Sequence, residues 1–180
     1  MQTGDTTVLL NAAEVKRELE RIAREIVAKG KGSVKDLALI GIHTRGVYLA
    51  RRLAGMIAAG TGEKVRTGTI DITLYRDDWT RISHHPVVQS TDIPFSVDDR
   101  RVVLVDDVLF TGRTTRAALD ALTDFGRPSR VELAVLVDRG LRELPIQADY
   151  VGKSIETGRD QTVNVMLTEC DQEDLVVVRG

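Results

Sequence analysis

The sequence predicts an α/β protein with an open, mostly parallel sheet and helices on both faces. Apolar runs, typical of strands that are covered on both faces, occur at 37–42 and 102–105, and the mostly apolar segment 131–137 predicts another buried strand. Segments with apolar residues at helical spacing lie before and between these runs. Strands that alternate with helices favour a parallel sheet, because each connecting helix packs against a face of the sheet.

The first helix is predicted to begin after Asn11. Asn11 and Glu14 have the spacing of a capping box, in which each side chain bonds to the backbone N–H of the other residue. Gly30 and Gly32 follow the helical pattern, and glycine commonly ends a helix. Between these limits, apolar residues recur on one helical face at Val15, Leu19, Ile22 and Ile26.

The strand at 37–42 is followed by the sequence HTRG, and the next helix is predicted at 47–59. The stretch Gly60-Thr61-Gly62 is expected to end this helix. The segment 65–75 is rich in β-branched residues and predicts a further strand, in which Gly68 is a weak point.

No periodic pattern covers the polar segment 75–97, which contains Pro86 and Pro94. A loop of this length in a compact domain is often functional, so we expect a lid here. Trp79 is unusual in a polar loop and is expected to be a lid contact or an interface residue. His84 and His85 do not predict a metal site, because two adjacent side chains point apart and no further ligands accompany them.

The remaining elements are a helix at 115–126, with Leu119 and Leu122 facing inward, and two short β-like segments at 162–167 and 175–178. No internal repeat or linker interrupts the chain, which indicates a single domain over residues 1–180.

The composition indicates a cytoplasmic protein that does not enter a membrane. The formal net charge of −2 argues weakly against general nucleic-acid binding, although a local basic face remains compatible with it. Cys170 is the single cysteine, so no internal disulfide can form, and a reducing compartment suits the chain. The sequence contains neither an apolar run of about 18 residues nor the pattern of a signal peptide.

Two adjacent carboxylates, Asp106 and Asp107, directly follow a buried strand and precede the hydroxyl-rich turn 111–115. Ligands of open parallel sheets bind at the carboxyl ends of the strands. The turn opens a helix, whose free N–H groups and nearby hydroxyls suit a phosphate. Carboxylates instead accept hydrogen bonds from sugar hydroxyls. The order of these features predicts a ligand with a ribose joined to a phosphate.

Other interpretations of this motif account for less of it. A Walker-B strand also ends in aspartate, but the partner loop GxxxxGK[ST] is absent, and GTGEK at 60–64 does not match it. A receiver-type acidic pocket leaves the turn at 111–115 unexplained. The simplest alternative is a polar strand end followed by a capped helix.

Two more strand ends carry polar residues. HTRG offers backbone N–H groups, Thr44 and Arg45 to a second anion, and Arg139 follows the strand 131–137. The alternatives are a helix entry with a surface arginine and a solvated loop arginine.

The motif around Asp106 resembles the signature of the type I phosphoribosyltransferases, which bind phosphoribosyl pyrophosphate (PRPP). Nearly the whole chain from Leu37 onward resembles the PyrR family, whose members regulate bacterial pyrimidine operons by binding RNA and are also uracil phosphoribosyltransferases. The segments that carry this resemblance are GIHTRG (41–46), DITLYRDD (71–78), FGRPS (125–129) and LAVLVDRGLRELPIQADYVGK (133–153).

The resemblance implies a glycosyltransferase of the pentosyl class that makes UMP and pyrophosphate from uracil and PRPP. Mg²⁺ is expected to bind through PRPP near Asp106, without direct protein ligands. The expected catalytic residues are Asp106, Asp107 and Arg76, and the expected nucleobase or UMP contacts are Arg139 and Val163. The residues expected to bind PRPP are Thr44, Arg45, Asp106, Asp107, Val108, Leu109, Phe110, Thr111, Gly112, Arg113 and Thr114.

One departure from the family pattern lies in the predicted pyrophosphate loop. Most members have lysine where this chain has His43, which changes an auxiliary charge and leaves the backbone N–H groups of the loop in place.

The resemblance also implies a homo-oligomer and UMP-dependent binding to the leader mRNA of a pyr operon, which attenuates transcription. Relatives commonly carry histidine in place of Leu141 and arginine in place of Gln147, so we expect weaker or differently targeted RNA binding. Three alternatives remain open: an enzyme without RNA regulation, an RNA-binding nucleotide sensor with negligible catalysis, and a purine phosphoribosyltransferase. The expected RNA contacts are Arg17, Arg24, Arg142 and Lys153, with Arg21 and Arg139 on the same basic face.

Overall fold

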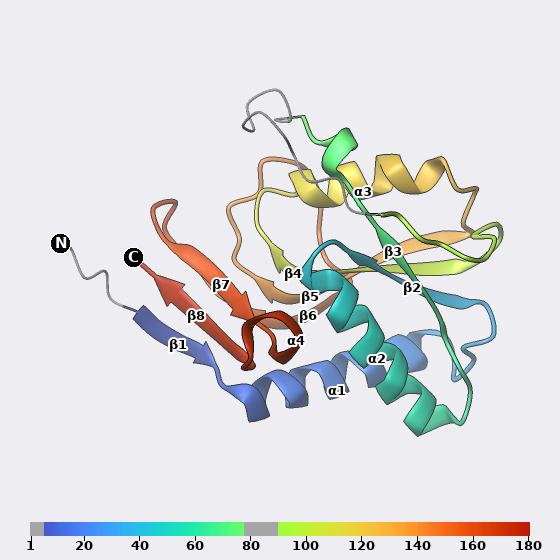
Figure 1. The fold of residues 1–180 in the computed structure, drawn as a ribbon, viewed down its shortest axis with the longest axis horizontal. Helices are drawn as coiled ribbons and strands as arrows, with labels where there is room; N and C mark the ends of the chain where they lie inside the picture. Colours follow the sequence, from blue (N-terminus) through green and yellow to red (C-terminus); the bar gives the residue numbers. More distant parts are fainter. Residues whose placement is uncertain (1–5, 78–89) are drawn as a thin grey trace.

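The computed structural model describes residues 6–77 and 90–180 (Figure 1). A five-stranded parallel sheet has the order β3-β2-β4-β5-β6, and a three-stranded antiparallel sheet has the order β1-β8-β7. In chain order the elements are β1 (Thr6–Leu10), α1 (Ala12–Lys29), β2 (Leu37–Ile42), α2 (Arg45–Thr61), β3 (Arg66–Ile70), the 3₁₀ helix η1 (Thr73–Tyr75), β4 (Arg101–Leu109), α3 (Arg113–Thr123), β5 (Arg130–Asp138), β6 (Tyr150–Ser154), β7 (Thr162–Met166), α4 (Thr168–Asp171) and β8 (Leu175–Arg179).

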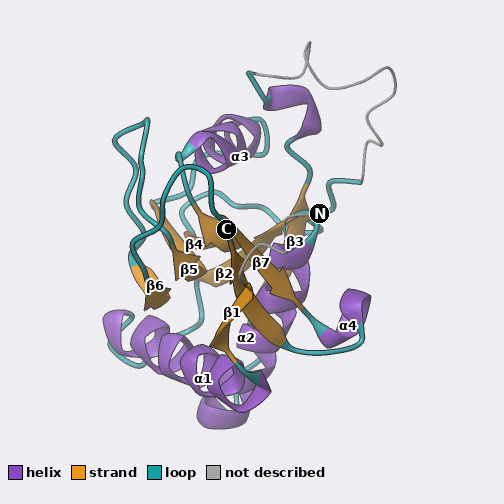
Figure 2. Ribbon diagram, turned by 90° about the vertical axis from the view of Figure 1, so that its left-hand side faces the viewer, coloured by secondary structure: helices purple, strands orange, loops and turns teal. Residues whose placement is uncertain are grey.

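Helices α1 and α2 cover one face of the five-stranded sheet, and α3 covers the other (Figures 1 and 2). Along β4, Val103 and Val105 pack in the cluster under α1 and α2, while Val102 and Leu104 pack in the cluster under α3. Successive side chains of a strand point to opposite faces, so an apolar run is what two covered faces require. The predicted fold class is confirmed.

Helix α1 begins as the sequence predicts. The side chain of Asn11 accepts a hydrogen bond from the N–H of Glu14 at 3.0 Å, and the carboxylate of Glu14 accepts one from the N–H of Asn11 at 2.9 Å. This reciprocal capping box satisfies N–H groups that the first helical turn leaves without partners.

Strand β4 is longer than the predicted strand at 102–105, so Asp106 and Asp107 lie within the strand rather than after it. The physical reason is its partner β5, because the pairing continues from Asp106 opposite Val135 to Leu109 opposite Asp138. On the other side, the pairing with β2 stops at Val105. Pairing with β5 alone therefore extends β4 past its apolar run and through the two acids.

The predicted strand at 65–75 is wrong in its second half, since β3 ends at Ile70. Asp71 accepts hydrogen bonds from the N–H and the hydroxyl of Thr73, at 2.8 and 2.6 Å, and turns the chain into η1. Leu122 is buried as predicted, but Leu119 is 36% exposed because it lies on the outer side of α3.

The predicted lid lies mostly outside the described residues, including Asp78, Trp79, His84 and His85. Within its described part, Asp92 pairs with Thr69 through backbone hydrogen bonds of 2.8 and 2.9 Å.

No helix in the described part of the chain is both long and apolar enough to cross a membrane. The same residues contain no cluster of three or more histidine, cysteine or carboxylate side chains that is suited to a metal ion.

The start of α2 lies directly against β4. A Cβ atom added to Gly46 would lie 2.3 Å from the carbonyl oxygen of Val105, far inside van der Waals contact. Gly46 is buried, and β4 is fixed between β2 and β5. Glycine at this position allows the HTRG segment to approach the two aspartates.

A buried charged cluster lies at the amino ends of β4 and β5. The carboxylate of Glu132 accepts hydrogen bonds from Arg101 and from the hydroxyl of Tyr150, both at 2.9 Å, and lies 3.2 Å from the ammonium of Lys29. The Glu132 side chain is 1% exposed, and both hydrogen bonds reach its Oε2, whereas Oε1 faces the ammonium of Lys29 without a hydrogen bond among the described residues. Burial and the hydrogen bond to Glu132 raise the pKa of Tyr150 to about 12.

Candidate active site

The turn between β4 and α3 lines a cavity of about 340 Å³ that we call the phosphate cavity, with Arg76, Asp77 and residues 108–115 in its wall. Gly112 adopts a left-handed conformation with φ of 90° and forms the N-cap of α3. Glycine has no side chain to cap the helix, and the N–H of Arg113 makes one long hydrogen bond of 3.4 Å to the hydroxyl of Thr111. The N–H groups of Thr114 and Thr115 remain available to an anion.

A second cavity of about 310 Å³, the acidic cavity, shares Arg76, Val108 and Thr114 with the phosphate cavity. The residues that line it are His43, Thr44, Asp71, Ile72, Thr73, Arg76, Asp106, Asp107, Val108 and Thr114. The structure therefore brings the predicted acids and Arg76 together with the HTRG segment, which comes from a different strand end.

Asp106 is the more buried of the two acids, at 8% exposure. Its carboxylate accepts a hydrogen bond from the N–H of Asp107 at 2.9 Å, and the carboxylate of Asp107 accepts one from the N–H of Val108 at 2.8 Å. Burial and then the charge of Asp107 raise the pKa of Asp106 well above its usual value. The site therefore favours a ligand that donates hydrogen bonds to the pair or brings a cation.

Asp71 and Thr73 line the acidic cavity, although the sequence analysis did not select them. Both residues lie within the predicted strand at 65–75, where polar side chains give no reason to expect a ligand site. The detectable signal was the Asp-x-Thr spacing, which is typical of a turn stabilised by an aspartate side chain.

Arg45 lies beside the acids but is bound to the short helix α4. Its guanidinium donates to Asp171 through Nε at 3.2 Å and through Nη2 at 2.9 Å. The N–H of Leu167, the thiol of Cys170 and then Arg45 lower the pKa of Asp171 to about 2. The predicted pyrophosphate loop is therefore connected to the segment that joins β7 to β8.

A third cavity of about 280 Å³, which we call the β7 cavity, adjoins Asp107 and Arg45. Its other lining residues come from β7 and β8: Val163, Asn164, Val165, Met166 and Arg179. Val163 is a predicted nucleobase contact, and the structure places it in the same cavity as Asp107. Asn164, Met166 and Arg179 did not emerge from the sequence analysis.

Arg139 lies apart from these side chains and lines none of the three cavities. The residue is 5% exposed, and its guanidinium donates to Thr157, to Gly158 and to Gln161 at 2.8–3.0 Å. The guanidinium also stacks on the ring of Phe110, 4.1 Å from the ring centre. These contacts give Arg139 a supporting position behind the phosphate turn.

Arg113 of the phosphate turn also has protein partners. Its guanidinium donates to Asp77 and, at 3.0 Å, to Glu143. The backbone of Arg113 belongs to the phosphate turn, whereas its side chain connects that turn to the start of the predicted lid segment.

The predicted RNA contacts differ in their exposure. Arg17 and Arg24 on α1 and Lys153 on β6 are exposed. Arg142 is instead occupied, since it forms an ion pair with Asp138 and donates to the carbonyl of Ile146 at 2.9 Å and that of Phe110 at 3.0 Å. Its guanidinium therefore stabilises the loop after β5.

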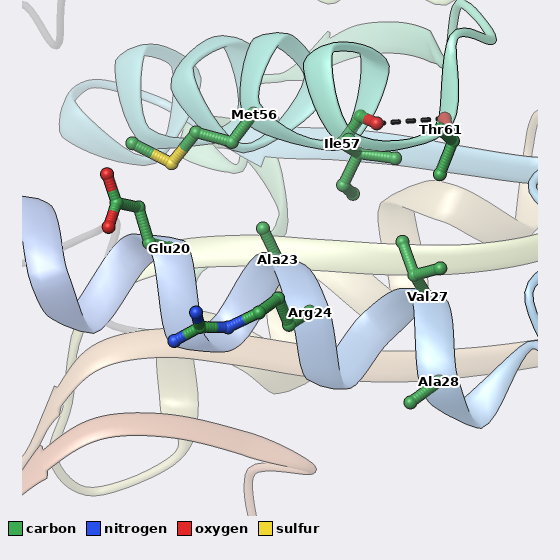
Figure 3. A pocket seen from close by; sticks show the side chains of 9 residues that line it. Glu20, Ala23, Arg24, Val27, Ala28, Met56, Ile57 and Thr61 are labelled. Atoms are coloured by element: carbon green, nitrogen blue, oxygen red, sulfur yellow. Dashed lines mark hydrogen bonds between the residues drawn. The ribbon is translucent and has the colours of Figure 1, made fainter.

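Arg21 joins α1 to β6. It donates to the carbonyls of Val151 and Gly152, at 2.7 and 2.8 Å, so α1 and β6 lie side by side. Arg24 lies on the wall of an apolar groove of about 380 Å³ between α1 and α2, which Figure 3 shows with Ala23, Val27 and Met56.

Comparison with known proteins identifies the family. The family model described as the phosphoribosyl transferase domain matches residues 5–173. The bifunctional protein PyrR of Desulfosudis oleivorans is 61% identical over 179 residues, covering 99% of this chain and 98% of that protein. The bifunctional protein PyrR of Deinococcus radiodurans is 53% identical over 174 residues, which cover 97% of this chain and 94% of that protein.

A structure of the hypoxanthine phosphoribosyl transferase of Trypanosoma cruzi matches with a TM-score of 0.74 at 21% identity, covering 100% of this chain and 93% of that one. At that identity the likeness concerns the fold alone. The family match and the two relatives confirm the resemblance that the sequence motifs carry: this chain belongs to the PyrR family and contains its phosphoribosyl transferase domain.

Proposed function

We propose that this chain is a uracil phosphoribosyltransferase, which forms UMP and pyrophosphate from uracil and PRPP. The observation that carries this proposal is the acid pair Asp106–Asp107 in a cavity that shares lining residues, Thr114 among them, with the cavity at the start of α3. A phosphorylated ribose needs these two surfaces next to each other. Membership of the PyrR family supports uracil as the acceptor.

Each group of the site has an assigned role. Asp106 and Asp107 accept hydrogen bonds from the ribose hydroxyls, and the turn 111–115 holds the 5′-phosphate. The HTRG loop, with Thr44 and Arg45, binds the pyrophosphate. Mg²⁺ usually binds through one or two carboxylates together with substrate phosphates, so the acid pair Asp106–Asp107 in the acidic cavity fits Mg²⁺ that is carried by PRPP. Mg²⁺ supplies charge neutralisation for the leaving pyrophosphate.

Catalysis rests on positioning and on charge. The bond between C1′ and the pyrophosphate oxygen breaks, the bond between C1′ and the uracil nitrogen forms, and that nitrogen loses its proton late. Positive charge develops on the ribose in between, and the carboxylates beside it stabilise that charge. Arg76 lies in both the phosphate and acidic cavities and is proposed to help hold PRPP. The segment after it is proposed to close over the substrates and exclude water.

A pyrophosphate-release assay with uracil and with hypoxanthine tests the proposed reaction. We expect PRPP-dependent release with uracil and little with hypoxanthine. A preference for hypoxanthine would assign the chain to the purine enzymes, and no release with either base would remove the enzymatic proposal.

A second function, UMP-dependent binding to the leader mRNA of a pyr operon, is favoured by the exposed cations on α1 and β6. Arg17, Arg24 and Lys153 lie on two elements that Arg21 joins, and neutralised phosphates provide much of the affinity for RNA. Arg142 supports this surface from inside the loop. The family also leads us to propose a cytoplasmic homo-oligomer, with residues 1–180 as one domain.

The RNA proposal predicts a salt-dependent loss of affinity when these charges are removed. The double variant Arg24→Gln/Lys153→Gln should bind the leader RNA at least about tenfold more weakly at low salt, with a shallower dependence on salt. The measurement is a titration with and without UMP, and Lys64→Gln, which removes an exposed charge after α2, is the control. If the wild-type protein binds the leader RNA no more tightly than an unrelated hairpin, the RNA proposal is removed and only the enzymatic function remains.

A further inference from the structure

We propose that the side chain of Asn164 binds the polar edge of the incoming nucleobase in the β7 cavity. This inference rests on the proposed function and adds to it a residue that determines the affinity for the base.

The position of β7 gives Asn164 access to the reacting centre. β7 is an edge strand, because the order of its sheet is β1-β8-β7. Residues 163–166 line the β7 cavity together with Asp107 and Arg45. Since Asp107 is assigned to the ribose and Arg45 to the pyrophosphate loop, this cavity lies next to the carbon at which the exchange takes place.

The alternation of side chains along β7 separates Asn164 from the core. Val165 is buried in the apolar cluster under α1 and α2, and Val163 packs against that cluster. Successive side chains of a strand point to opposite faces, so Asn164 lies on the face away from this cluster. Asn164 is half-buried, and within residues 6–77 and 90–180 its side-chain amide has no hydrogen-bond partner. A partly desolvated amide without a protein partner is suited to bind a ligand.

The chemistry of the amide matches that of uracil. Uracil presents an N–H donor between two carbonyl acceptors, and a carboxamide presents one donor and one acceptor in a plane. Two parallel hydrogen bonds can therefore join them, as asparagine joins the edge of adenine in nucleic-acid recognition. Met166, which lies two residues further and therefore on the same face of β7 as Asn164, supplies an apolar contact for the ring.

The rival occupant of the β7 cavity is the pyrophosphate, because two arginines line the wall. Arg45 is already held by Asp171 through hydrogen bonds at 2.9 to 3.2 Å, and Arg179 is exposed at the end of β8. Asp171 offsets part of the charge that Arg45 presents to the β7 cavity, and His43 and Thr44 of the pyrophosphate loop line the acidic cavity instead. The nucleobase is therefore the occupant of the β7 cavity that we test.

The experiment compares the wild type with Asn164→Leu, which keeps the size and removes both hydrogen-bonding groups, and with Asn164→Asp, which keeps the shape and replaces the donor by an acceptor. We expect the KM for uracil to rise about tenfold or more in both variants, with the KM for PRPP within about twofold of the wild type. Thr7→Val is the control, since Thr7 is exposed on β1 at the opposite edge of the same sheet. Thermal unfolding of each variant reports whether the fold is retained.

Sulfur analogues of uracil separate a contact from a structural effect. Sulfur accepts hydrogen bonds more weakly than oxygen, so 4-thiouracil or 2-thiouracil should bind the wild type more weakly than uracil does. That difference should largely vanish in Asn164→Leu. An unchanged KM for uracil in both variants, an equal penalty for the analogues in wild type and Asn164→Leu, or a rise only in the KM for PRPP would each overturn the assignment. A wild type inactive with uracil would instead remove the proposed function.

Discussion

Replacing Asp106 and Asp107 together with asparagine is expected to lower kcat/KM for uracil and PRPP by at least about 100-fold, or about 3 kcal/mol of transition-state stabilisation. Asparagine keeps the shape of each side chain but removes the negative charge that faces the ribose. An amide also binds Mg²⁺ and sugar hydroxyls less strongly than a carboxylate does. Initial rates of pyrophosphate release over a range of both substrates measure this loss.

The fold should survive this double substitution. Burial raises the pKa of Asp106, so the ionised form is less favourable in the folded chain than in the unfolded one. An acid with a raised folded-state pKa makes folding less favourable as the pH rises above its unfolded value, and asparagine removes that cost. We therefore expect an equal or higher Tm at pH 7. Asp36→Asn, on an exposed loop, is the control, and a double variant with wild-type turnover would remove the ribose assignment.

Gly46→Ala is expected to destabilise the protein by about 3 kcal/mol and to reduce its activity, although it adds a single methyl group. The added carbon would lie 2.3 Å from the carbonyl oxygen of Val105 and 3.2 Å from the Cα of Asp106, so the backbone of α2 or β4 must move. Either movement separates Thr44 and Arg45 from the acid pair. The measurements are the free energy of unfolding in urea and kcat/KM for the same substrates.

Gly55→Ala provides a matched control within the same helix. No atom lies within 4 Å of the Cβ position at Gly55, and alanine favours a helix over glycine by about 1 kcal/mol. This variant should be as stable as the wild type or more stable. If Gly46→Ala unfolds at the wild-type urea concentration, the close approach of α2 to β4 is wrong.

Much of the site follows from local sequence, whereas its side-chain partners do not. The apolar run before Asp106 and the glycine and hydroxyls after it define a strand end and a phosphate turn without any knowledge of the rest of the chain. Arg139 and Arg142 look alike in the sequence, as charged residues of one loop. Their hydrogen-bond partners, including the carbonyls of Gln161 and Phe110, come from segments that only the folded chain brings together.

The sequence did not predict β1 and β6 either, because their stability also depends on partners that the fold supplies. β1 and β6 are short, and each is stabilised by pairing with a strand distant in sequence or with the edge of the sheet. Asn164 carried no signal either, because a single amide in a β-like segment becomes informative only when a cavity and its unpaired hydrogen-bonding groups are known.

The charged cluster around Glu132 lies at the opposite end of β4 from the acid pair, and this separation predicts how mutations in the two places combine. Arg101 and Asp106 are five residues apart in β4, or about 17 Å along the strand, so substitutions at the two positions are expected to act additively on stability. Alleles that abolish catalysis at the carboxyl end should therefore yield full-length protein that accumulates normally in the cell. Such alleles are expected to impair uracil salvage and UMP-dependent operon control together without loss of the protein, because the ribose contacts that catalysis needs are also those that hold UMP.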